Sequence, residues 1–337
     1  MTSVAAKVFA CLLVMSSCGT ADNVLATDVG ATARSTKAND ISDATRRSLA
    51  GALFQAIEND DANQVKLLLA QGADPNYGGP DGRCGPLWNS FDASLTIVRD
   101  LLVAGANPNC VWADKSGGED QSLSTPLMAA ASMKGSRSVG RGGRMAWTNR
   151  PARKDMPKPA DVIKLLLEFG AKPNTRSYFG TNVLYDAIDA DDVEAALALI
   201  DGGLDINSTI NASMPGEVQP WYRGQTALMH ALGRFDLKNL GSGKKMIGML
   251  LQKGANPNVL PYGNFVSDCG QGTPPCSFSG ETPLSYEARL GYTVYVQLLL
   301  EHGAKPDGPR ADGAKPETIA AKAGHAKIAA LIARYEK

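Results

Sequence analysis

One phrase occurs six times in this chain of 337 residues, and this repetition restricts the fold more than any other feature. The copies are KLLLAQGADPN (66–76), RDLLVAGANPN (99–109), KLLLEFGAKPN (164–174), LALIDGGLDIN (197–207), GMLLQKGANPN (248–258) and QLLLEHGAKPD (297–307). Their glycines are separated by 33, 65, 33, 51 and 49 residues, so a unit of 33 residues occurs twice without additions. A period of this length is typical of a solenoid, in which each unit packs only against its neighbours. The length of the chain therefore does not imply two domains.

Each copy of the phrase predicts the end of a helix. Val65, Leu68 and Leu69 fall on one helical face, and Leu67 widens this apolar stripe, so we expect a neighbouring element to cover it. Gly72 is expected to end the helix, because the position after a helix commonly takes a positive φ that glycine adopts at little cost. A helix and a glycine turn are therefore expected in every copy.

A second short helix is predicted upstream of each copy. Its starts are Gly85-Pro86-Leu87, Thr125-Pro126-Leu127, Thr181-Asn182-Val183-Leu184, Thr226-Ala227-Leu228 and Thr282-Pro283-Leu284. In front of the helix that carries the phrase, Asp61 precedes Gln64 and Asp191 precedes Glu194 by three residues, which is the spacing of a capping box. The acidic clusters around these positions also contain metal-ligating residue types, but capping explains them more simply, and we predict no metal site.

This unit of two helices, with a Thr-Pro-Leu start and a Gly-Ala-Asx-Pro-Asn end, resembles the ankyrin repeat. The resemblance covers roughly residues 49–337 and implies an all-α solenoid of about seven helix-turn-helix repeats, the seventh from Asp312 to Lys337. It implies β-hairpin-like fingers between repeats and a repeat domain over 48–337, with insertions at about 134–158, 208–224 and 259–281. The histidine that usually follows Thr-Pro-Leu is replaced, for example by Met128 or Met229, whereas the apolar spacing and the turns are retained.

In ankyrin-repeat proteins the finger tips and the first helices line a concave face that binds partners, so the resemblance implies a protein partner on that face. Aromatic residues concentrate on the fingers of this chain and are candidate contacts, because aromatic side chains are enriched among the residues that dominate binding energy. They are Tyr77, Trp112, Tyr178, Phe179, Trp221, Tyr222, Tyr262 and Phe265. Packing of the long fingers against one another is the alternative interpretation.

The first 18 residues resemble a bacterial export signal, since Lys7 precedes an apolar run, Val8 to Met15, that is too short to span a bilayer. Met15-Ser16-Ser17-Cys18 resembles a lipobox, so Cys18 is a candidate for lipidation, and residues 19–47 are predicted to be a flexible tether. Because Gly19 and not Asp follows the cysteine, we expect a lipoprotein on the periplasmic face of the outer membrane. A soluble periplasmic or secreted protein is the alternative, and a cytoplasmic protein is the third interpretation.

The insertion at 134–158 is strongly basic, although the whole chain has 34 basic and 34 acidic residues. It contains eight basic residues and one acidic residue, a net charge of +7. Its candidate partner contacts are Arg137, Arg141, Arg144, Trp147, Arg150 and Arg153. Two interpretations stay open: a solvated flexible loop, or an element that binds an acidic protein or anionic lipid headgroups. We expect no nucleic-acid partner, because the export signal places the protein where little is present.

Four cysteines remain besides Cys11 and Cys18. Adjacent ankyrin fingers stack side by side, so the resemblance favours a Cys84–Cys110 disulfide, and the short span between Cys269 and Cys276 favours a second one. A zinc site is the alternative, but none of the three histidines stands near these cysteines at ligand spacing.

No catalytic motif accompanies His230, His302 or His325, so we predict that the chain is not an enzyme and needs no cofactor. We expect a monomer that binds another macromolecule. One hypothesis is an inhibitor, similar to lipid-anchored immunity proteins that neutralise secreted toxins such as phospholipase effectors. The alternative is a structural adaptor or scaffold that holds an envelope enzyme or the anionic membrane surface.

Overall fold

The computed structural model describes residues 42–78, 84–113, 123–134, 156–177, 180–210, 224–235, 239–260, 280–308 and 313–336. The chain divides into two compact units, Met1–Asp43 and Ala44–Lys337, and the description below concerns the second. The predicted export signal at 1–18 and most of the predicted tether lie outside the described residues. The first helix begins at Asp43, so residues 43–47 are helical and not part of a tether as the sequence suggested.

Seven helix pairs follow one another along the residues that the structure describes. They are α2 (Asp43–Glu58) with α3 (Ala62–Ala70), α4 (Gly85–Asn89) with α5 (Leu95–Val103), α6 (Pro126–Ser132) with α7 (Pro159–Glu168), α8 (Val183–Asp189) with α9 (Val193–Asp201), α10 (Ala227–Arg234) with α11 (Leu240–Gln252), α12 (Pro283–Leu290) with α13 (Thr293–Glu301), and α14 (Pro316–Lys322) with α15 (Ala326–Tyr335). A short 3-10 helix η1 (Ser90–Asp92) extends α4. We number these pairs as repeats 1 to 7.

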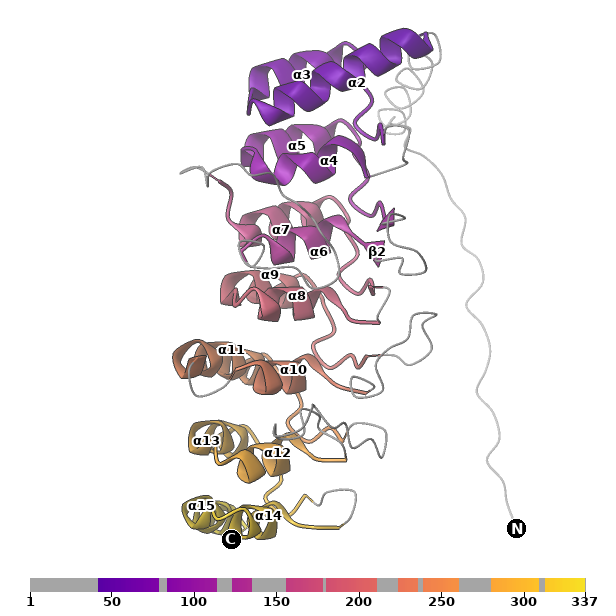
Figure 1. The fold of residues 1–337 in the computed structure, drawn as a ribbon. Helices are drawn as coiled ribbons and strands as arrows, with labels where there is room; N and C mark the ends of the chain where they lie inside the picture. Colours follow the sequence, from indigo (N-terminus) through magenta and orange to yellow (C-terminus); the bar gives the residue numbers. More distant parts are fainter. Residues whose placement is uncertain are drawn as a thin grey trace, which may run out of the picture. The chain divides into compact units, whose positions relative to one another are not determined.

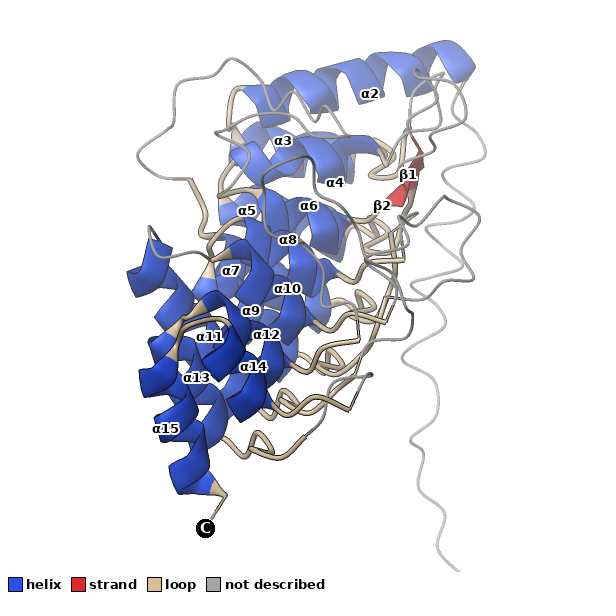
Figure 2. Cartoon of the chain, turned by 60° about the horizontal axis from the view of Figure 1, so that its bottom comes forward, coloured by secondary structure: helices blue, strands red, loops and turns tan. Residues whose placement is uncertain are grey.

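The pairs stack in order, as Figures 1 and 2 show. The first helices contact one another in the series α4, α6, α8, α10, α12 and α14, and the second helices do so in the series α3, α5, α7, α9, α11, α13 and α15. One hydrophobic cluster of aliphatic side chains and alanines continues between the two rows, from Leu53 to Ile332. The prediction of an all-α solenoid of about seven repeats is therefore confirmed.

The glycine turns confirm the prediction made from the repeated phrase. The six glycines have φ between 84° and 96°, at Gly72, Gly105, Gly170, Gly203, Gly254 and Gly303. The next residue donates its N–H to a carbonyl in the last turn of the helix, as Ala73 does to Leu68 at 3.0 Å. This arrangement satisfies a carbonyl that the helix end would leave without a partner.

The helix starts agree with the sequence in part. The side chains of Thr125, Thr226 and Thr282 cap α6, α10 and α12, and the Asp61 carboxylate accepts from the Gln64 N–H at 2.9 Å. In repeat 4, however, α9 is capped by Asp192, whose carboxylate accepts from the Ala195 N–H, and not by Asp191. The reason is the turn between the helices, where Asp191 takes a φ of 50° and so cannot be the cap.

Two further details differ from the sequence interpretation. The residue that caps α8 is Asn182, so it and not Thr181 is the equivalent of the capping threonines. Leu67 is 50% exposed on α3, although its apolar side chain suggested that a neighbour would cover it. Val65 and Leu68 of the same helix are buried.

Candidate functional site

Asparagine side chains connect the finger bases along the whole array. The Asn that ends each of five copies of the phrase donates its amide to the carbonyl of the next helix-ending glycine, at 2.8–3.2 Å. The same side chain accepts from the backbone N–H two residues after that glycine, at 2.7–2.8 Å. These residues are Asn76, Asn109, Asn174, Asn207 and Asn258. Each finger therefore starts from a position fixed by the repeat before it.

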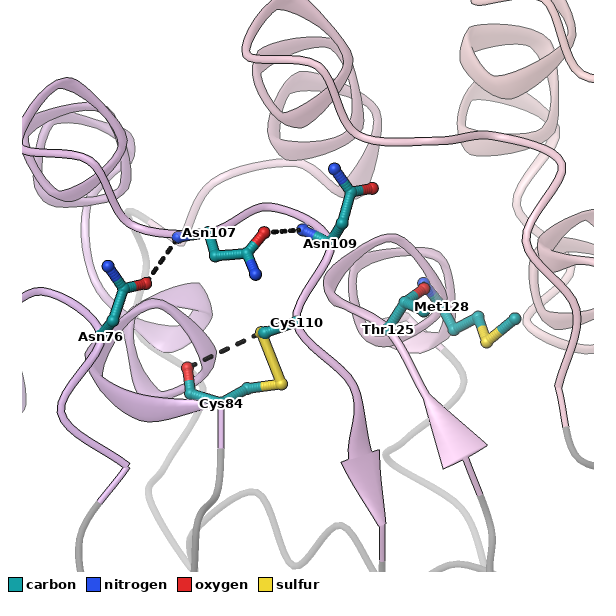
Figure 3. The surroundings of a disulfide bond; sticks show 7 residues. All are labelled: Asn76, Cys84, Asn107, Asn109, Cys110, Thr125 and Met128. Carbon is teal, nitrogen blue, oxygen red and sulfur yellow. Dashed lines mark hydrogen bonds between the residues drawn. A yellow bond between two sulfur atoms is a disulfide. The ribbon is translucent and has the colours of Figure 1, made fainter.

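Among the described residues, the finger between repeats 2 and 3 contains the two-stranded sheet. Its strands β1 (Trp112–Ala113) and β2 (Leu123–Ser124) are antiparallel, with Trp112 opposite Ser124. Two residues before Trp112, Cys110 forms a disulfide with Cys84, and the two Cα atoms lie 5.5 Å apart (Figure 3). Because Cys84 precedes α4, the disulfide ties this finger to the first helix of repeat 2.

The finger before this hairpin passes close to α4. An added Cβ on Gly85, which has a φ of 60°, would lie 3.0 Å from the backbone oxygen of Tyr77. The candidate contact Tyr77 is thereby held beside the start of the helix, with its side chain half-buried. A side chain at position 85 would push this finger away.

The fingers on either side of α8 are joined by side chains that sequence reasoning did not identify. The Arg176 guanidinium donates to the carbonyl of Gly180 in its own finger and to that of Thr209 in the next, both at 2.8 Å. The Tyr185 hydroxyl donates to the Gln225 carbonyl at 2.9 Å, and burial raises the pKa of Tyr185, so the hydroxyl keeps its proton. The sequence signal for this contact is the arginine at the start of a finger, because a guanidinium has five N–H groups that can donate to nearby carbonyls.

Titratable side chains gather on the first helices of repeats 4 and 5. The His230 ring nitrogen Nε2 lies 2.9 Å from Asp189 Oδ1, and Arg234 Nε lies 3.5 Å from the same oxygen. The His230 ring also packs on Tyr185, with 4.7 Å between ring centroids. Burial, with a smaller contribution from Asp189, raises the pKa of Asp186 to about 8. This part of the first-helix face is therefore polar.

Both ends of the basic insertion contact repeat 4, one at the turn between α8 and α9 and the other at the start of α9. Lys134 Nζ donates to the Asp191 carbonyl at 2.7 Å, and Lys158 Nζ lies 3.6 Å from Glu194 Oε2. These ends lie between the end of α6 and the start of α7, whereas fingers join a second helix to the next first helix. The insertion and the fingers therefore leave the array at opposite ends of α6, about 10 Å apart along a helix of seven residues.

The other predicted site residues lie outside the described part of the chain. They are Cys18, Arg137, Arg141, Arg144, Trp147, Arg150, Arg153, Tyr178, Phe179, Trp221, Tyr222, Tyr262, Phe265, Cys269 and Cys276. The backbone of Trp112 is described and its side chain is not. Among the helices that the structure describes, none has the length and apolarity needed to cross a membrane.

Comparisons with known proteins show what the chain is similar to. No family model matches it. One curated relative, ankyrin repeat and MYND domain-containing protein 1 of Homo sapiens, is 27% identical over 262 residues, which is 74% of this chain and 21% of the relative. The chain thus spans about a fifth of that relative's length.

Solved structures with the same arrangement include three ankyrin repeat domains. The domain of Bcl-3, described as a unique member of the IkappaB protein family, has a TM-score of 0.57 at 20% identity and covers 84% of this chain and 97% of its own. Human ASB11 has a TM-score of 0.50 at 19% identity, covering 83% and 96%. A domain from Acinetobacter baumannii AYE has a TM-score of 0.51 at 22% identity, covering 75% and 98%. At these identities the likeness is one of fold.

Proposed function

We propose that this ankyrin-repeat chain binds a protein partner on the face formed by its first helices and fingers. The observation that carries the proposal is the set of side chains that join each finger to the next repeat, above all the Asn76 to Asn258 series. A face held in this way loses little conformational freedom when a partner binds, and extended concave faces are how solenoids bind partners. We propose no enzymatic activity.

We further propose that the protein works in the bacterial envelope, anchored by a lipid on Cys18. The signal-like sequence of residues 1–18 supports this. So does the Cys84–Cys110 disulfide, since such bonds persist in oxidising compartments and are rare in the cytosol. Cys18→Ser should move the protein from the membrane fraction to the soluble fraction. A variant that stays in the membrane fraction would show that the lipid anchor is wrong.

For the role of the bound partner, we propose inhibition of a secreted toxin, such as a phospholipase, by an immunity-type protein. The second candidate is an adaptor at the anionic membrane surface, which the +7 charge of the insertion favours. Two binding assays distinguish these functions, each done with residues 19–337 and with a variant of them that lacks Ser136 to Pro157. An inhibitor captures a toxin from envelope extract without lipid, whereas an adaptor binds phosphatidylglycerol vesicles in a salt-sensitive way that the deletion abolishes.

A further inference from the structure

Helix α11 in repeat 5 differs from the other second helices by its glycines. It contains Gly241, Gly243 and Gly248 within 13 residues, whereas α3, α5, α7, α9, α13 and α15 contain none. An added Cβ on Gly248 would meet nothing within 4 Å, so packing does not require this glycine. Glycine inside a helix is destabilising relative to alanine, because the unfolded chain has more backbone freedom to lose. The second helix of repeat 5 is therefore intrinsically weak.

Gly243 has a different role. An added Cβ there would collide with the Tyr295 hydroxyl of α13 and lie 2.6 Å from Phe235 Cβ. The Tyr295 hydroxyl thus lies directly against the α11 backbone at Gly243, and the Tyr295 side chain is fully buried. The packing of repeat 6 on repeat 5 consequently depends on α11 being helical.

Helix α12 of repeat 6 contains a second weak point. Glu287 is fully buried, and neither of its carboxylate oxygens has a hydrogen-bond partner, within the part of the chain that the structure describes. Ala130, Ala187, Ala231 and Ala320 occupy the same position after the cap in repeats 3, 4, 5 and 7, and all are fully buried. A buried polar group without a hydrogen bond is unfavourable. Repeat 6 is thus destabilised at a position that is apolar in its neighbours.

Repeats 6 and 7 are in turn held to each other. Arg289 of α12 forms a bidentate ion pair with the buried Glu281, with Nη2 2.8 Å from Oε2. The carbonyl of Arg289 lies 3.2 Å from His325 Nε2 in repeat 7. The His325 ring also packs against Gly291, where an added Cβ would lie 2.6 Å from it. These contacts couple α12 to α14 and α15.

We propose that α11 to α15 open together, as one cooperative block, while the repeats before them stay folded. Each repeat of a solenoid contacts only its neighbours, so the stability of the individual repeats determines where the array opens. The two weak points lie in α11 and α12, which follow one another along the chain at the start of the segment that Figure 1 shows from α11 to the C-terminus. The face of repeats 6 and 7 is then available to a partner only while this block is closed. This inference does not depend on the identity of the partner.

Native-state hydrogen exchange of the whole chain tests the block, with Gly248→Ala as the main variant. We expect α11, α13 and α15 to share one free energy of opening, and we expect it to be lower than the opening free energy of α5, α7 and α9. Gly248→Ala should slow exchange about threefold or more in all three helices of the block, including the distant α15, and leave α5 to α9 unchanged. Glu287→Gln should have the same pattern.

Gly51→Ala is the matched control, because Gly51 also lies inside a helix with nothing within 4 Å of an added Cβ. It should slow exchange in repeat 1 and leave the block unchanged. Three results would overturn the proposal: protection that declines stepwise from α11 to α15, a Gly248→Ala effect confined to α11, or an equal effect in every helix.

Discussion

Replacing Glu287 with glutamine should stabilise the folded chain at neutral pH and change its stability little in acid. Burial raises the pKa of Glu287 well above its ordinary value of 4.5, and the nearby Arg289 guanidinium offsets only part of that effect. Arg289 is already bonded to Glu281, so it cannot also bind the Glu287 carboxylate well. Burial raises the pKa of the adjacent Tyr286 to about 12, so its hydroxyl stays neutral beside Glu287. The buried carboxyl therefore keeps its proton to a higher pH than a solvated glutamate does.

The sign and size of the effect follow from proton binding. Below about pH 4.5 the carboxyl is protonated in both the folded and the unfolded chain, so burial carries no ionisation penalty. As the pH rises, the unfolded chain ionises first, and the folded chain loses up to about 1.4 kcal/mol of stability per pH unit until its own carboxyl ionises. Glutamine has the same size and no proton to lose. Its advantage should thus grow between pH 5 and pH 7, by up to about 3 kcal/mol.

Urea unfolding followed by circular dichroism at pH 5, 6 and 7 measures this difference. The raised pKa of Asp186 gives the wild-type chain a slope of the same sign, but it is present in both proteins and cancels. Glu301→Gln makes the same chemical change at an exposed position of α13 and should shift stability by less than about 0.5 kcal/mol at every pH. A Glu287→Gln protein that is no more stable than wild type at pH 7 would refute the reasoning, because the carboxylate would then be ionised and stabilised in the fold.

Three more predictions concern the array. Reducing the Cys84–Cys110 disulfide, or replacing both cysteines with serine, should lower the unfolding free energy by about 2–4 kcal/mol, as expected for a loop of this size; unchanged urea unfolding with and without dithiothreitol would contradict it. Asn109→Ala removes two hydrogen bonds between repeats and should lower the melting temperature through a loss of about 1–2 kcal/mol of stability. An unchanged melting temperature would show that these two hydrogen bonds do not stabilise the array. Gly243→Ala should destabilise by about 1–3 kcal/mol because two aromatic side chains occupy the space of its Cβ, while Gly248→Ala should stabilise by up to about 1 kcal/mol; the same sign for both in thermal unfolding would be inconsistent with this packing.

Turns and helix ends were predictable because they depend on a few consecutive residues. Gly72 and the other five glycines of the phrase have the positive φ that the pattern indicated, and Thr125 caps its helix. The sequence predicted the cap of α9 one residue too early, at Asp191, since Asp189, Asp191 and Asp192 lie within four residues and only the turn geometry shows which of them caps the helix. The exposure of Leu67 was missed because a helical stripe shows which residues are apolar and not which of them a neighbour reaches.

The sequence by itself determined the repeat, the two helices within it and the fold class, because a local signal repeated six times leaves few other ways to bury the same apolar face. Only the tertiary structure decided which polar side chains meet. Arg176 bonds to Thr209 and His230 pairs with Asp189 across 33 and 41 residues of chain. Likewise Glu287 is buried without a hydrogen bond to any residue that the structure describes, at a position where repeats 3, 4, 5 and 7 have alanine. Such contacts arise from the stacking of one repeat on another, and the distance between two repeats along the chain varies with the insertions, so no fixed spacing encodes them.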